Sequence, residues 1–298
     1  MSVVGPGGGP AGVAAGSLLA ELEEPPAPHT RGRRRRFPPL WRVVILVAAF
    51  IFFLGPIAAS IKYSLIQTNG SYGFGNYSQI ISNSSVRDAM FKSLEIAAVT
   101  AFLVVVLMLP TVVLVRLKLP KLTLFMEGLT IIPLVVPPIV IAAGLAALQG
   151  SSPQWVKNVW FNHPLTALTP VYVVLAMPFS YRAFDTGVRA IDLRTLVDAS
   201  RSLGASWFST LVRVILPNVE TAVLGAVFLT IAFCLGEVVI ATILLYVTLP
   251  VEMIDVSGTS PGVSVALSVL GLLGVFLLLF SLSFLAGRRR GATSVRVI

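Results

Sequence analysis

Six apolar stretches, separated by short polar segments, make up most of this chain. A membrane-spanning helix needs about 20 apolar residues, and the six stretches are close to that length, the fourth being the shortest. They are Leu40–Ile61, Phe91–Val115, Thr123–Leu148, Leu165–Phe179, Val219–Val247 and Val263–Ala286. The polar segments between them are too short to form a separate catalytic domain. The pattern therefore predicts an all-α membrane protein with six transmembrane helices.

The composition agrees with this prediction. Of the 298 residues, 56% are hydrophobic and 12% are charged, whereas about a quarter of a soluble domain is charged. The single cysteine, Cys234, excludes a disulfide or a cysteine-based metal site within one chain. The chain has no phosphate-binding loop of the form G-x-x-x-x-G-K-S/T, so it is not expected to hydrolyse ATP itself. We expect a non-catalytic chain that binds no cofactor or metal.

The distribution of basic residues predicts the orientation in the membrane. Most of the 22 Lys and Arg fall in alternate polar segments, and cytoplasmic segments are the ones enriched in these residues. Both termini are therefore predicted to be cytoplasmic. Residues 1–36, which end in RGRRRR, are predicted to be a disordered basic tail, 37–287 the membrane domain and 288–298 a second tail. The net charge of +9 reflects this topology, so no nucleic-acid partner is expected.

Two features inside the apolar stretches bear on a pathway across the membrane. The third stretch contains Pro133, Pro137 and Pro138, each of which removes a backbone hydrogen-bond donor. Irregular backbone at membrane depth needs protein or a water-filled cavity to satisfy the freed groups, so this stretch is predicted to line the pathway. The fifth contains Glu237 near its middle, where a charge costs about 2.5–3.5 kcal/mol. Glu237 either faces the pathway or is hydrogen-bonded to a neighbouring helix.

Residues 181–217 form the longest polar interruption in the second half of the chain. Asp192 is a suitable N-cap for a short helix, and Gly204 supplies its stop. Ser206 can cap a second helix, Trp207–Leu216, which Pro217 is predicted to end. One face of the first helix carries Leu193, Leu196, Val197, Ser200 and Leu203. This pattern fits a helix that docks on a partner and a helix that lies on the membrane surface equally well.

The same segment resembles a known motif. Asp198-Ala199-Ser200, then Gly204, then Val214-Ile215-Leu216-Pro217 is similar to the "EAA" signature of permease subunits of binding-protein-dependent ABC importers. That signature reads E-A-A, three residues, G, nine residues and I-x-L-P. The spacing matches at every step, and three residues depart from the letters: Asp198, Ser200 and Val214. The resemblance extends from about residue 63 to 282 and is greatest to the spermidine/putrescine group.

The resemblance implies a type I ABC importer permease in a bacterial cell membrane. Its partners would be two ABC ATPase subunits that bind ATP and Mg, a second permease subunit and an extracytoplasmic substrate-binding protein. The residues that it implies for coupling to the ATPase are Asp198, Ala199, Ser200, Arg201, Gly204 and Pro217. The residues predicted for the substrate pathway are Phe233, Cys234, Glu237, Pro137 and Pro138.

The resemblance implies a polyamine as substrate, because a carboxylate such as Glu237 suits a cationic amine. The alternatives within the same importer class are sulfate, molybdate, ferric iron, phosphonate or a sugar. The alternative of another class is a secondary transporter or channel that works without ATP. Such proteins often have helix breaks in both halves, and the sequence predicts a break in the third stretch but none in the fourth, fifth or sixth.

Overall fold

The computed structural model describes residues 40–67 and 69–293. It divides into two units, Met1–Phe52 and Phe53–Ile298, and helix α2 (Leu40–Ser64) belongs to both. The predicted tail 1–36 lies outside the described residues. Residues 288–293 of the predicted second tail continue the last helix, and 294–298 lie outside.

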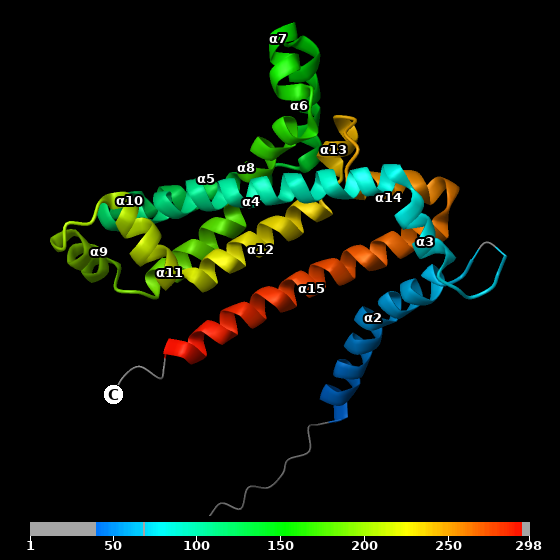
Figure 1. The fold of residues 1–298 in the computed structure, drawn as a ribbon, viewed down its shortest axis with the longest axis horizontal. Helices are drawn as coiled ribbons and strands as arrows, with labels where there is room; N and C mark the ends of the chain where they lie inside the picture. The colour runs from blue at the N-terminus through cyan, green and yellow to red at the C-terminus, as the bar shows by residue number, and fades with distance from the viewer. Residues whose placement is uncertain (1–39, 68, 294–298) are drawn as a thin grey trace, which may run out of the picture. The chain divides into compact units, whose positions relative to one another are not determined.

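The described part of the chain is helical, as predicted, and its one β contact is an isolated bridge between Ile66 and Tyr72. Figure 1 shows the helices in chain order. After α2 they are α3 (Gly75–Ser82), α4 (Ser84–Lys118), η1 (Pro120–Leu122), α5 (Thr123–Val135), α6 (Pro138–Ser151), α7 (Gln154–Val156), η2 (Lys157–Phe161), α8 (Pro164–Arg189), α9 (Leu193–Ser202), α10 (Trp207–Thr210), η3 (Leu211–Ile215), α11 (Leu216–Asn218), α12 (Glu220–Gly236), α13 (Val239–Ile243), α14 (Leu249–Thr259) and α15 (Pro261–Thr293).

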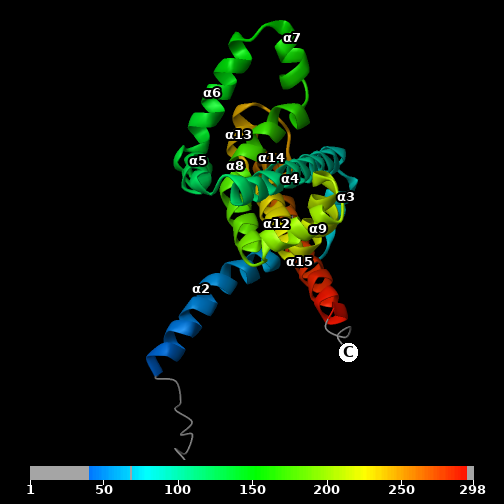
Figure 2. The ribbon, with the colours of Figure 1, turned by 90° about the vertical axis from the view of Figure 1, so that its left-hand side faces the viewer.

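Helices α4, α8 and α12 pack together and form the core of the second unit (Figures 1 and 2). Val113 of α4 and Phe184 of α8 are fully buried in this core. Helices α8 and α12 approach each other closely at Gly187, where an added Cβ would lie 2.3 Å from the Cβ of Ala222. Small residues allow backbones in a membrane to approach this closely.

The third apolar stretch is broken where its prolines predicted irregular backbone. Helices α5 and α6 meet at an angle of 83°. Between them Val136 and Pro137 are extended, with ψ of 121° and 134°. Proline blocks the hydrogen bond of a continuing helix and disfavours helical backbone in the residue before it. Pro133 is accommodated inside α5, so Pro137 and Pro138 set the break.

The prediction of one continuous helix over the fifth stretch is wrong. Helix α12 ends at Gly236, Glu237 is extended (φ −79°, ψ 122°), and a separate short helix, α13, follows. Helix α13 packs against α6. The segments that follow the two breaks therefore lie together, with Ala142 of α6 and Ala241 of α13 both fully buried.

Helices also extend into the polar segments between the predicted stretches, among them α3, α8 and α14. Helix α8 continues past the predicted end at residue 179 to Arg189, so it includes the first part of segment 181–217. Helix α14 occupies most of a predicted polar loop, because Leu249 and Val251 bury their side chains and Pro250 lies in its first turn. Proline is well tolerated there, since the first turn leaves its N–H groups unpaired in any case.

Three helices in the described part of the chain, α2, α4 and α8, are long and apolar enough to cross a membrane. Two bent pairs, residues 120–135 with 138–151 and 207–218 with 220–236, raise the number to five. In α15 the part Pro261–Leu277 is apolar, and by itself it is shorter than these helices. A multi-pass membrane protein is supported, while the number of six spans and the orientation of the termini stay predictions.

Candidate functional site

The segment between α8 and α12, residues 190–219, is here called the α8–α12 loop. Its first helix, α9, begins as predicted at Asp192. The carboxylate accepts hydrogen bonds from the hydroxyl of Thr195 (2.7 Å) and from its backbone N–H (3.3 Å). These bonds, the one from the hydroxyl above all, lower the pKa of Asp192. The cap is therefore fully formed at neutral pH and is lost as the pH falls through that lowered pKa.

Helix α9 ends at Gly204, also as predicted. The N–H of Gly204 donates to the carbonyl of Arg201 (3.0 Å), and the N–H of Ala205 donates to the carbonyl of Ser200 (3.2 Å). This pair of bonds is the Schellman motif, which needs a left-handed residue. Gly204 supplies it, with φ of +81°. The chain is thereby turned back sharply after α9.

The predicted coupling residues divide between two sides of α9. Leu193, Val197 and Ser200 are buried, and the hydroxyl of Ser200 lies 2.9 Å from that of Thr210 in α10. Ser200 therefore joins the two short helices to each other. The exposed side carries the remaining coupling candidates and the last residue of the predicted apolar face: Asp198, Ala199, Arg201 and Leu203.

The second half of the loop differs from the prediction at Pro217. Ser206 caps α10 by accepting a hydrogen bond from the N–H of Ser209 (3.2 Å). A π-helical turn, Leu211–Ile215, follows, and Pro217 lies inside α11 instead of ending the helix. The chain then bends by 84° at Val219 into α12.

A chain of four alternating charges lies where the loop leaves α8. Asp185 accepts hydrogen bonds from the guanidinium of Arg116 of α4, one of them from Nε at 2.7 Å. Its other oxygen lies 2.8 Å from Nε of Arg189. Arg189 in turn reaches Glu127 of α5 at 3.2 Å. Helices α4, α5 and α8 are thus joined three residues before α9 begins. This network was not predicted, although the i, i+4 spacing of Asp185 and Arg189 is typical of an ion pair on a helix.

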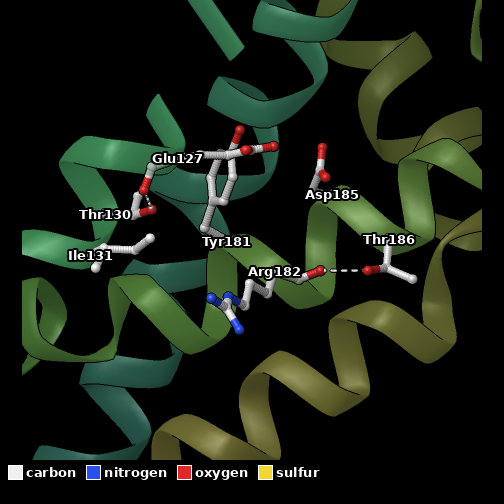
Figure 3. A pocket seen from close by; sticks show the side chains of 7 residues that line it. All are labelled: Glu127, Thr130, Ile131, Tyr181, Arg182, Asp185 and Thr186. Atoms are coloured by element: carbon white, nitrogen blue, oxygen red, sulfur yellow. Dashed lines mark hydrogen bonds between the residues drawn. The ribbon is translucent and has the colours of Figure 1, made fainter. Parts of the chain in front are cut away.

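A pocket of ≈ 300 Å³ adjoins this network (Figure 3). Figure 3 shows Glu127 and Tyr181 among the residues around the pocket, and the guanidinium of Arg182 pointing away from Asp185. The pocket is lined by seven residues: Glu127, Thr130, Ile131, Tyr181, Arg182, Asp185 and Thr186. The described residues contain no group of three or more His, Cys, Asp or Glu side chains placed to hold a metal ion.

The pathway candidates gather around the two helix breaks. Glu237 is 8% exposed. One carboxylate oxygen accepts the hydroxyl of Tyr172 of α8 (2.7 Å) and the other accepts the N–H of Ile240 (2.9 Å). Cys234 is buried beside it, and the ring of Phe233 packs edge-on against Tyr172. Pro137 and Pro138 form the break before α6, which contacts α13.

The arrangement is that of a helical membrane domain with a polar, internally hydrogen-bonded loop at one end of α12 and a helix break at the other. Residues 116–291 match the family described as binding-protein-dependent transport system inner membrane component. The chain belongs to this family. The match contains the whole α8–α12 loop and both helix breaks. A break in each half would have suited a secondary transporter, but the family is that of ABC permease components.

Two known proteins are similar to this permease over much of its length. A probable molybdenum ABC transporter permease protein of Haloferax volcanii is 28% identical over 250 residues, which are 82% of this chain and 89% of that protein. A probable ABC transporter permease protein of Sinorhizobium fredii is 27% identical over 211 residues, 65% of this chain and 36% of that protein. The chain is thus a membrane component of an ABC transporter, and its family implies an ATPase and a substrate-binding protein as partners.

Proposed function

We propose that this permease forms the pathway of an ATP-driven importer and couples it to a separate ATPase through the α8–α12 loop. The observation that carries the proposal is the exposed side of α9. Asp198 and Ala199 lie on this side, and the Ser200–Thr210 contact and the Gly204 turn hold the two helices of the loop together. A rigid loop between α8 and α12 transmits a push from the ATPase to both helices.

The remaining components follow from this role. The ATPase dimer binds ATP and Mg, and this chain binds no cofactor. A second permease subunit completes the pathway, and a substrate-binding protein delivers the substrate from outside. The complex lies in a bacterial cell membrane with both termini of this chain in the cytoplasm, where charge counting puts the α8–α12 loop as well.

We propose an oxyanion such as molybdate as the substrate. The support is the 28% identity to a probable molybdenum permease over most of both chains. A polyamine is the second candidate, because the negative charge of Glu237 would suit a cationic amine. That carboxylate is buried and accepts hydrogen bonds from Tyr172 and Ile240, so in this structure it is not open to a cationic substrate.

The experiment is ATP hydrolysis by the complex of this permease with its own ATPase, in lipid vesicles, with its own binding protein added. We expect hydrolysis to rise when the binding protein carries molybdate and to stay at the basal rate with putrescine or spermidine. Asp198→Lys should abolish the rise, because it reverses a charge on the docking surface. If only a polyamine stimulates hydrolysis, the substrate is a polyamine and not molybdate. If no ATPase co-purifies with the wild-type permease, the importer role itself is wrong.

A further inference from the structure

The turn between α13 and α14, residues 244–248, contains a strained leucine. Leu245 has φ of +61°, the only positive φ at a non-glycine position in the described part of the chain. Such a conformation costs roughly 1–3 kcal/mol for a residue with a side chain. The side chain is also 87% exposed. It therefore gains no packing inside the protein that would compensate for the strain.

The local backbone explains why glycine would be expected at this position. The N–H of Leu245 donates to the carbonyl of Thr242 (3.1 Å), and that of Tyr246 donates to the carbonyl of Ala241 (2.9 Å). The same pair of bonds ends α9, and there the left-handed position is Gly204. A glycine at position 245 would form the same turn without strain. The backbone strain at Leu245 is therefore not needed to form this turn.

The turn is held firmly on both sides of the leucine. Leu244 and Thr248 are each 3% exposed. The hydroxyl of Tyr246 donates to the carbonyl of Phe161, in the turn before α8 (2.7 Å). The N–H of Leu249 donates to the hydroxyl of Ser93 of α4 (2.7 Å). The exposed side chain is therefore presented by a backbone that is fixed to two other elements.

The position of this turn in the fold indicates which partner Leu245 contacts. Helix α12 begins beside the α8–α12 loop and has 17 residues, a length of about 25 Å at 1.5 Å per residue. The turn follows the far end of that helix. If the α8–α12 loop faces the ATPase, the turn faces the other side of the membrane. The basic-residue count predicts that residues 248–262, which begin three residues after Leu245, are outside.

We propose that Leu245 is an apolar anchor that contacts the extracytoplasmic substrate-binding protein. The proposal rests on the proposed importer function and names a contact point for one of its partners. An exposed apolar side chain that fills a pocket of its partner contributes strongly to an interface. Presentation on a fixed backbone lowers the entropy that is lost on binding. Contact with the partner thus accounts for both the exposure and the strain.

The decisive variant is Leu245→Gly. It removes the side chain and suits the positive φ, so the fold should be as stable as in the wild type or more stable. The assembled transporter in nanodiscs should bind its purified binding protein, carrying the ligand identified in the hydrolysis experiment, about 10-fold more weakly. Leu245→Met is the matched control, because it keeps an apolar side chain of similar size, and it should bind almost as the wild type does.

Wild-type affinity for the binding protein in Leu245→Gly would overturn the proposal. A loss of affinity seen in nanodiscs but absent in detergent micelles would also overturn it, since the leucine would then contact lipid. These results differ from a failure of the importer role itself. In that case the wild-type complex would not respond to the binding protein at all.

Discussion

The carboxylate of Glu237 lies at the point where α12 stops and connects α8 with α13. Its two oxygens accept one bond from Tyr172, on another helix, and one from the N–H of Ile240, in the helix that follows. A buried charge is tolerated when it is paired or hydrogen-bonded, and here its hydrogen bonds also hold the chain out of the helical path. These bonds fit a structural role for Glu237, and its pathway role stays a prediction.

Tyr172→Phe tests this role. The substitution removes one donor from a buried carboxylate, and a hydrogen bond to a charged group contributes about 1.5–3 kcal/mol. We expect the midpoint of thermal unfolding in detergent to fall. Tyr72→Phe is the control, because Tyr72 is 65% exposed, and it should leave the midpoint unchanged. If Glu237→Gln abolishes uptake with no loss of stability, Glu237 belongs to the pathway after all.

Local residue roles in the α8–α12 loop could be predicted from the sequence. The caps at Asp192 and Ser206 and the stop at Gly204 depend on residues within four positions, and the structure has all three. The partner of Glu237 could not be predicted, because Tyr172 lies 65 positions away. Ser200 was expected on the docking surface, but its contact with Thr210 depends on how two helices fold against each other.

At the scale of elements, the crossing of α8 and α12 depends on the absence of a side chain at Gly187. We expect Gly187→Ala to destabilise the protein by about 1–3 kcal/mol, the usual range for an overpacked core, because the new methyl group would lie 2.3 Å from the Cβ of Ala222. Adding Ala222→Gly should recover most of the loss, as a double-mutant cycle of thermal unfolding would show. Gly225→Ala is the control, since nothing lies within 4 Å of its added Cβ.

A Gly187→Ala protein as stable as Gly225→Ala would show that the two helices do not cross at this point. Lack of rescue by Ala222→Gly would show that the methyl group meets some other atom. Either result would remove the close contact on which the transmission of movement from α8 to α12 depends.

The sequence predicted the existence of the helices better than their ends. The break before α6 was predictable because proline acts on its own backbone. The break at Glu237 was missed, because a single acidic residue in an apolar run indicates a charge and not the bonds that will satisfy it. Helix α8 was predicted too short, because Asp185 and Arg189 have the composition of a loop. They stay helical since Arg116 and Glu127 pair with them from other helices.

At the scale of the second unit, the two ends of α12 carry different surfaces. One end leads from the α8–α12 loop, whose exposed side carries Asp198 and Ala199. The other leads through the break at Glu237 to the turn of Leu245. Helix α8 links the same regions, since it starts beside Phe161 and ends at Arg189. If the loop moves on docking of the ATPase, as proposed, α8 and α12 are the two packed helices through which the movement would reach the far side.

The most direct test of the account is a thiol-anchored photo-crosslinker placed on α9 in the assembled complex. The account predicts that Ala199→Cys forms a crosslink to the ATPase, because Ala199 is on the exposed side, and that Ser200→Cys does not, because Ser200 is buried against α10. Cys234, the chain's own cysteine, is buried and stays unlabelled. A crosslink from Ala199→Cys to lipid, with none to the ATPase, would contradict the account and make α9 a membrane-surface helix.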